Sequence, residues 1–171
     1  AATMGIEENL ALAKRRGKPR LLRSGITAAE RTEYKELLKI LDLGLEDRLT
    51  SKVGLLSGGQ RQRVFIAMAL AQNTKILFLD EPTTYLDIRY QLDILRLVKK
   101  LNREYGITIV MVLHEINQAI HFSDEVIGLK DGKVLVQGDP KDVITTESIS
   151  ELYDVHLNVA DIDGQKFVLT V

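Results

Sequence analysis

The sequence predicts an α/β fold, with a helical first third followed by a strand–helix–strand unit. Two short apolar runs, Ile76–Leu79 and Thr108–Leu113, have the length of strands and flank a long helical pattern at Ile88–Tyr105. Two strands joined by a crossover helix pair in parallel, so we expect a parallel sheet. Because both runs are continuously apolar, both strands are expected to be buried on both faces.

Helix signals dominate the chain before the first strand. A short amphipathic stretch at Ile6–Ala13 predicts the first helix. Thr27-Ala28-Ala29-Glu30 has the spacing of a capping box and predicts a second helix that ends near Leu41. Ser57 is a good N-cap and predicts a third helix that continues to Ala71.

Turn residues divide the C-terminal part into short elements. Asp131-Gly132 predicts a two-residue hairpin, and Asp163-Gly164 predicts a last one. Asp139-Pro140 reads as a helix cap followed by proline at the first helical position. The elements expected here are a helix at Glu115–Phe122, strands at Val126–Leu129 and Val134–Val136, short helices up to Tyr153, and strands at Val155–Val159 and Lys166–Val171.

The composition excludes several classes of function. The 171 residues carry a net charge of −1, so no global field attracts nucleic acid, and no nucleic-acid partner is expected. There are no cysteines, which rules out disulfides and thiolate metal sites. The longest apolar runs are too short to span a bilayer, and the N-terminus has no features of a targeting peptide.

Leu56-Ser57-Gly58-Gly59-Gln60 is the sharpest local feature. Two glycines at a helix start let the backbone approach a ligand closely. The free N–H groups and the dipole at that start favour an anion such as a phosphate, to which the Ser57 hydroxyl adds a donor. The alternative is a Ser-capped helix with a flexible entry, and the motif taken alone leaves both open.

Three further acids and one histidine stand at strand and helix ends. Asp80 and Glu81 follow the first strand, where α/β folds bind ligands; Asp80 is placed to serve Mg²⁺ through water and Glu81 to act as a general base. His114 follows the second strand, where its imidazole can hydrogen-bond a phosphate. The alternatives are solvated loop acids for Asp80 and Glu81, a structural role for His114, and a helix cap for Asp87.

Taken in order, LSGGQRQR, ILFLDEPT, TYLD and IVMVLHE resemble the ATP-binding subunits of ABC transporters, from about Val53 to Lys133. The resemblance implies that Ser57, Gly58, Gly59 and Gln60 form the signature motif, which contacts the γ-phosphate of ATP held by the opposite subunit. It further implies Mg²⁺ at Asp80 in the Walker B strand, a catalytic base at Glu81, a D-loop at Asp87 that crosses the dimer interface, and a switch histidine at His114.

The same resemblance sets the expected architecture. It is an incomplete P-loop NTPase core with a parallel sheet and a helical N-terminal subdomain, in three segments: helical residues 1–56, the signature helix and core at 57–138, and C-terminal helices and hairpin at 139–171. The family also requires a Walker A loop, G-x-x-x-x-G-K-[ST], and no such motif occurs. Gly-Lys occurs at Gly17-Lys18 and Gly132-Lys133, but Leu12 and Ile127 stand where the first glycine belongs.

Because the Walker A loop is missing, we expect the chain to start inside the helical subdomain and to be inactive alone. The resemblance implies a lineage that hydrolyses ATP with Mg²⁺ to drive transport. An uncovered face or edge of the sheet is expected to give a homodimer or swapped oligomer. The family context implies permease partners in the membrane and a cytoplasmic location at its inner face. A relative that binds or repairs DNA is disfavoured, since long coiled-coil inserts and a basic surface are lacking.

Two branches of the family are visible. FLDEPTTYLDIRYQLDIL and the segment from VMVLHE resemble ferric-siderophore or haem importer ATPases, whereas IEENLALAKRRGK and GLEDRLTSKVGLLSGGQRQ resemble another ABC ATPase branch. This predicts a seam near Gln60–Val64, in a chimera of natural, assembled or engineered origin. The alternative function is therefore a non-catalytic truncated or chimeric fragment. The basic run Lys14–Arg23 is expected to be solvated or to contact a membrane-domain helix or lipid headgroups.

Overall fold

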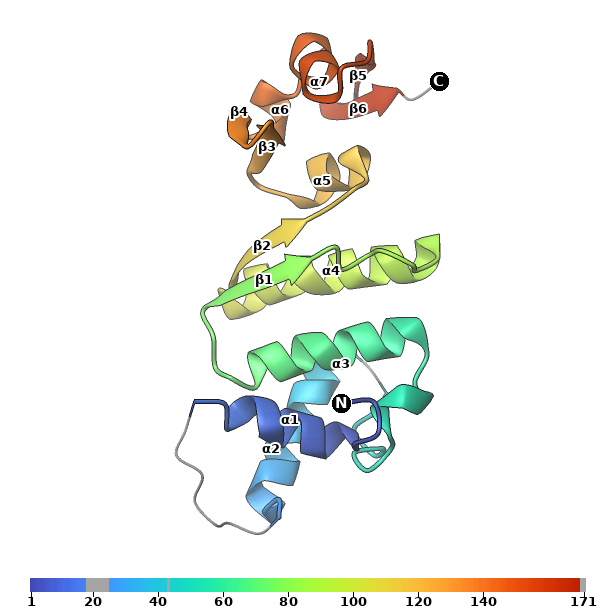
Figure 1. Ribbon diagram of the computed structural model, residues 1–171, viewed down its shortest axis with the longest axis vertical. Coiled ribbons are helices and arrows are strands. Elements are labelled where there is room, and N and C mark those ends of the chain that lie inside the picture. Colours follow the sequence, from blue (N-terminus) through green and yellow to red (C-terminus); the bar gives the residue numbers. More distant parts are fainter. Residues whose placement is uncertain (18–24, 43, 170–171) are drawn as a thin grey trace. The chain divides into compact units, whose positions relative to one another are not determined.

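A computed structural model describes residues 1–17, 25–42 and 44–169 (Figure 1). The chain divides into two compact units, Ala1–Val112 and Leu113–Val171. Most of the basic run predicted to face solvent or a partner, residues 18–23, lies outside the described residues. The three segments expected from the sequence stay a prediction, and each unit is described below by itself.

Helices form the N-terminal part of the first unit, as predicted. Helix α1 spans Ile6–Lys14, α2 spans Ala28–Ile40, a short 3-10 turn spans Val53–Leu55, and α3 spans Gly58–Leu70. The capping box expected at Thr27 is present, because its hydroxyl accepts from the Glu30 N–H while the Glu30 carboxylate accepts from the Thr27 N–H. One apolar core joins these helices; its fully buried members include Ile6, Leu10, Tyr34, Leu38 and Ile66.

The predicted strand–helix–strand unit is present and parallel. Strand β1 (Ile76–Asp80) pairs with β2 (Thr108–Val112) in a register that runs from Ile76 opposite Thr108 to Asp80 opposite Val112. The crossover helix α4 spans Ile88–Tyr105 and ends at Gly106, whose left-handed backbone (φ 64°) is the usual way to close a helix. Ile94, Leu95, Val98 and Leu101 form the buried stripe of α4.

Within the first unit only one face of this two-stranded sheet is covered by the described residues, so the expectation that this unit buries both faces is wrong. Leu77, Leu79, Ile109 and Met111 pack on the core shared with α3 and α4. The other face leaves Phe78 74% exposed, and Ile76, Val110 and Val112 about half exposed. The apolar run shows that both faces suit burial, but it does not say which segments supply the cover. The exposed face agrees with the separate expectation of an uncovered sheet.

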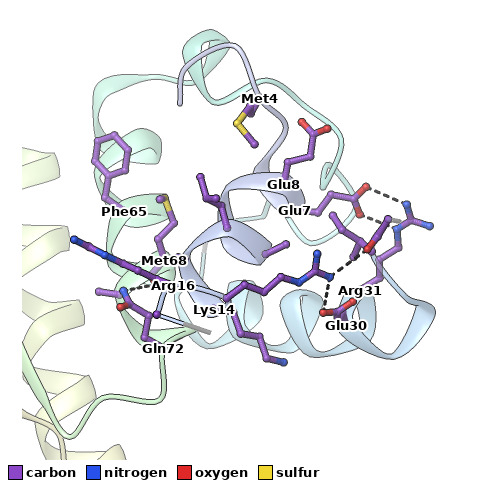
Figure 2. Close-up of a pocket in the computed structure, with 18 residues that line it drawn as sticks. Met4, Glu7, Glu8, Lys14, Arg16, Glu30, Arg31, Phe65, Met68 and Gln72 are labelled. Atoms are coloured by element: carbon purple, nitrogen blue, oxygen red, sulfur yellow. Dashed lines mark hydrogen bonds and ion pairs between the residues drawn. The ribbon is translucent and has the colours of Figure 1, made fainter. Parts of the chain in front are cut away.

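Ion pairs tie α1 to α2, and the pair of Arg31 with Glu7 is drawn in Figure 2. Arg31 points to Glu7, whose side chain is buried between the helices. Arg15 donates to Glu30 at 2.9 Å, and Lys14 pairs with Glu33. The C-terminal end of α2 faces cations from two other helices, because Arg63 donates to the Asp42 carbonyl at 3.1 Å and Lys100 to the Ile40 carbonyl at 3.4 Å.

The second unit combines short helices with two hairpins. Its elements are α5 (Ile116–Phe122), β3 (Val126–Lys130), β4 (Lys133–Gly138), α6 (Pro140–Val143), α7 (Thr146–Tyr153), β5 (Asn158–Ile162) and β6 (Gln165–Leu169). Both hairpins turn at the predicted pairs: Asp131-Gly132 and Asp163-Gly164 all have positive φ, as a type I′ turn requires. Asp139 caps α6 as expected, with its carboxylate accepting from the Lys141 N–H at 2.9 Å. Ile120, Ile144, Ile149 and Val168 form the core.

Candidate functional site

The signature residues form the first turn of α3. The Ser57 Oγ accepts from the Gln60 N–H at 3.3 Å, and the Gln60 Oε1 accepts from the Ser57 N–H at 3.2 Å. This reciprocal pair satisfies two of the N–H groups that a helix start leaves open. Ser57 and Gly58 are exposed, so a helix N-terminus with its partial positive charge faces solvent here. The capping role and the phosphate-binding role predicted for Ser57 are compatible with this geometry.

Arg61, one turn further along α3, binds the residues that precede the signature. Its Nη2 donates to the carbonyls of Gly54 and Leu56 at 3.3 and 3.2 Å. The segment just before Ser57 is therefore bonded to the helix that Ser57 starts. Both distances are at the long end of the hydrogen-bond range, and the two bonds together link the segment before the signature to α3.

Asp80 and Glu81 lie together at the C-terminal end of β1. Asp80 is exposed and ends the strand, while the Glu81 N–H extends the parallel ladder by donating to the Val112 carbonyl at 3.1 Å. Glu81 has a positive φ of 47°, which is uncommon for a residue other than glycine and occurs at turns as well as at functional sites. Its carboxylate accepts from the Thr84 hydroxyl at 3.2 Å. This bond gives the proposed base a fixed neighbour.

A metal at Asp80 would need ligands beyond these residues. No group of three or more His, Cys, Asp or Glu residues that could hold a metal ion occurs in residues 1–17, 25–42 and 44–169. Mg²⁺ bound to a nucleotide is held by only one or two carboxylates, with water and phosphate oxygens filling the other positions. Asp80, exposed beside Glu81, fits that limited role and does not fit a metal site made by protein alone.

The loop Thr84–Asp87 connects this strand end to α4. The Leu86 N–H donates to the Thr83 carbonyl at 3.3 Å, and Tyr85 has a positive φ of 62° with its side chain fully exposed. Asp87 caps α4, since its Oδ1 accepts from the Tyr90 N–H at 3.3 Å. The cap that the sequence offered as the alternative for Asp87 is thus present, and it leaves the carboxylate exposed at a second helix start.

The structure brings the signature and this loop into contact within the first unit. A Cβ placed on Gly58 would lie 3.4 Å from Cδ2 of Leu86, and one placed on Gly59 would lie 2.9 Å from Cδ1 of Tyr90. Sequence reasoning missed Tyr90, and also Gln91, whose Nε2 donates to the Leu86 carbonyl at 2.9 Å. The two glycines are the signal in the sequence that something approaches closely, and at Gly59 the closest group is the Tyr90 ring.

His114 belongs to the second unit, where it is exposed and precedes α5. The other predicted site residues all lie in the first unit: Ser57 to Gln60 and Asp87 at two neighbouring helix starts, and Asp80 and Glu81 at the end of β1.

A hollow beside α1, α2 and α3 is separate from all of these residues (Figure 2). Its walls include Glu7, Arg31, Phe65 and Met68, and none of the predicted site residues. Gly17 and Gly25 also line it, and the residues between them lie outside the described chain. We therefore assign no function to this hollow.

The sequence profile of the ABC transporter family matches residues 2–84. The ferric enterobactin transport ATP-binding protein FepC of Escherichia coli (strain K12) is 48% identical over 118 residues, which cover 69% of this chain and 44% of that protein. The chain belongs to the ABC transporter family. It spans less than half the length of the curated relatives that match it first.

Solved structures of ABC proteins have the same fold. A metal-chelate type ABC transporter in an inward-facing conformation matches 98% of this chain and 65% of its own chain, with a TM-score of 0.81 at 24% identity, a level that establishes the fold alone. A dimeric ATP-binding cassette bound to ADP and Pi is 38% identical, with a TM-score of 0.64 over 82% of this chain and 58% of its own. These likenesses confirm an incomplete α/β P-loop ATPase fold. Within the described residues, no helix has both the length and the apolar character needed to cross a bilayer.

Proposed function

We propose that this chain supplies the signature half of an ATP site, and that Ser57–Gln60 contact the γ-phosphate of an ATP molecule bound by an opposite subunit. The observation that carries the proposal is the exposed, Ser-capped N-terminus of α3 next to the loop that ends in Asp87. Free N–H groups and a positive helix end are suited to a phosphate that comes from outside the chain.

The acids at the end of β1 take the chemical roles in this proposal. Asp80 serves Mg²⁺ through water, and Glu81 withdraws a proton from the water that attacks the γ-phosphate. The hydrogen bond from Thr84 orients the Glu81 carboxylate. His114 is the residue proposed to hydrogen-bond a terminal phosphate, the role that the family resemblance implies for it. Asp87 faces the opposite subunit from the start of α4.

The 171 residues do not complete a site of their own, because they contain no P-loop sequence to hold the triphosphate. We therefore propose that the chain hydrolyses no ATP by itself. The competing possibility is a fragment, truncated or chimeric with its seam near Gln60–Val64, that has the fold and no longer contacts ATP at all.

The relatives indicate which process the intact protein serves. Matched relatives are named for transport of ferric enterobactin and for import of petrobactin and iron(3+)-hydroxamate. We propose that the protein powers import of a ferric siderophore, as one of two ATP-binding subunits beneath membrane-spanning permease subunits at the cytoplasmic face. A dimeric relative bound to ADP and Pi supports the paired arrangement.

The test adds a second protein that brings the phosphate-binding half of the ATP site. The purified chain is mixed with a hydrolysis-deficient variant of FepC, which brings its own phosphate loop, and association is followed by size-exclusion chromatography with and without Mg·ATP. We expect association that needs Mg·ATP and is lost in Ser57→Arg, whose long cation fills the phosphate position. Arg89→Ala is the matched control, as Arg89 is exposed on the first turn of α4.

Two outcomes would count against the proposal. If the chain does not associate with the FepC variant under any nucleotide condition, the competing fragment hypothesis is favoured. If the chain alone shows Mg²⁺-dependent ATP turnover that Glu81→Gln abolishes, the chain is active alone and the claim of a missing site is wrong.

A further inference from the structure

Two consecutive residues of α4, Tyr90 and Gln91, contact both segments that the proposed function presents to the opposite subunit. Tyr90 lies against Gly59 in the signature, and Gln91 is bonded to Leu86 in the loop Thr84–Asp87. Neither residue has a role in the chemistry described above. Both residues lie between the two segments.

The contact of Tyr90 explains why residue 59 is a glycine. A Cβ at this position would lie 2.9 Å from Cδ1 of the Tyr90 ring, closer than real Cβ atoms approach, and 3.2 Å from Cγ, which is also tight. Gly59 has no positive φ, so its backbone conformation does not require glycine. The requirement comes from the ring, which covers the buried Gly59 while remaining 39% exposed itself.

Gln91 holds the loop Thr84–Asp87 by hydrogen bonds. Its side-chain Nε2 donates to the Leu86 carbonyl at 2.9 Å, and the Gln91 backbone N–H donates to the Asp87 carbonyl at 3.0 Å. The side chain of Leu86 in turn reaches to 3.4 Å from the position a Cβ on Gly58 would take. Gln91 is therefore bonded to the residue whose side chain lies beside the first residue of α3.

We propose that Tyr90 and Gln91 are positioning residues that hold the signature and the loop Thr84–Asp87 as one rigid unit. The proposal rests on the proposed function, in which both segments must meet the same opposite subunit together. A ligand that needs two groups at once binds more tightly when their relative position is already set. Tyr90 acts through Gly59 and Gln91 acts through Leu86, and neither touches ATP.

The first test uses the free chain and requires no ATP. Amide hydrogen exchange is measured by NMR at Gln60 and Arg61, whose N–H groups bond to Ser57, and at Leu86 in the loop. Gln91→Met removes the side-chain bond to the Leu86 carbonyl, and Tyr90→Ala removes the ring that lies against Gly59. We expect each variant to speed exchange by about tenfold in both segments, because the segments open together.

Matched variants separate positioning from a local structural role. Tyr90→Phe keeps the ring and is expected to exchange like the unmodified chain, as is Arg89→Ala on the same helical turn. If Gln91→Met changes exchange at Leu86 alone, and leaves Gln60 and Arg61 unchanged, the two segments are independent and the proposal is overturned. If Tyr90→Ala prevents folding, Gly59→Ala tests the same contact from α3, and unchanged exchange at Leu86 in that variant also overturns it.

The second test measures the consequence for association. In the mixture with the hydrolysis-deficient FepC variant and Mg·ATP, Gln91→Met and Tyr90→Ala are expected to weaken association about tenfold, while Tyr90→Phe is expected to preserve it. Unmodified association in both weakening variants would contradict the inference. Failure of the unmodified chain to associate would contradict the proposed function instead, so the two failures are distinguishable.

Discussion

Arg31 of α2 contacts the buried carboxylate of Glu7 on α1 at two points, with Nε 2.7 Å from Oε2 and Nη2 3.1 Å from Oε1. We predict that Arg31→Ala lowers the free energy of unfolding, because it removes both donors from a carboxylate that water reaches poorly. Arg31→Lys should recover only part of the loss, since an ammonium group lacks the planar fork. Urea unfolding followed by circular dichroism measures the effect.

The control for this pair is Lys39→Ala, which removes an ion pair with Glu36 that is exposed on both sides. Exposed pairs contribute little to stability, so this variant should unfold almost like the unmodified chain. Equal losses in Arg31→Ala and Lys39→Ala would show that the burial of Glu7 does not matter.

Neighbouring residues of β1 are predicted to differ in how much their substitution changes stability. Leu77 faces the core and is 3% exposed, so Leu77→Ala should cost about 2–5 kcal/mol of unfolding free energy. Phe78 is 74% exposed on the uncovered face, so Phe78→Ser should leave stability nearly unchanged and reduce self-association. Urea unfolding and light scattering over a range of protein concentration measure the two effects. Undiminished self-association in Phe78→Ser would mean that this face is not the one that associates.

The Glu30 carboxylate gives the helical part of the chain a predictable dependence on acid. Its pKa is lowered from 4.5 to about 2, first by the hydrogen bond from the Thr27 backbone N–H and then by the Arg15 guanidinium. A lowered pKa in the folded state means that the stabilisation is complete above the ordinary pKa and is lost as the pH falls through about 2.

The matched variant is Glu30→Gln, which keeps an acceptor for the Thr27 N–H and removes the charge. We expect the unfolding free energies of the unmodified chain and this variant to differ by a constant amount near neutral pH, and to converge as the pH is lowered from about 5 to about 2. A difference that stays constant down to pH 2 would refute the role of the charge.

Short sequence motifs predicted the helices and hairpins, because caps and turns depend on interactions between residues close together in the chain. The cap at Thr27 and the hairpin at Asp131-Gly132 depend on residues at most three apart, and the structure confirms both. The sequence could not predict the exposed face at Phe78, since the cover of a strand comes from segments distant along the chain. The pairing of Glu7 with Arg31, 24 residues apart, depends on how two helices cross and was likewise not visible.

The candidate site shows the same division. The order of the motifs predicted Ser57 to Gln60, Asp80 and Glu81, which all stand at helix or strand ends in the structure. Tyr90 and Gln91 carry no motif, and only the packing of α4 against the start of α3 reveals them. A pair of glycines in a sequence therefore predicts that another group approaches the backbone closely. Only the fold shows whether that group is a neighbouring side chain.

Ser57 caps α3 and is proposed to contact the γ-phosphate, and one substitution distinguishes the two roles. Ser57→Ala removes the acceptor for the Gln60 N–H and should cost about 1 kcal/mol of unfolding free energy. Ser57→Asp keeps an N-cap of equal quality, so stability should be retained within a few tenths of a kcal/mol, about the spread among good caps. Its carboxylate repels the γ-phosphate, so Mg·ATP-dependent association with the FepC variant should be lost. If Ser57→Asp associates as the unmodified chain does, Ser57 is only a helix cap and does not meet the nucleotide.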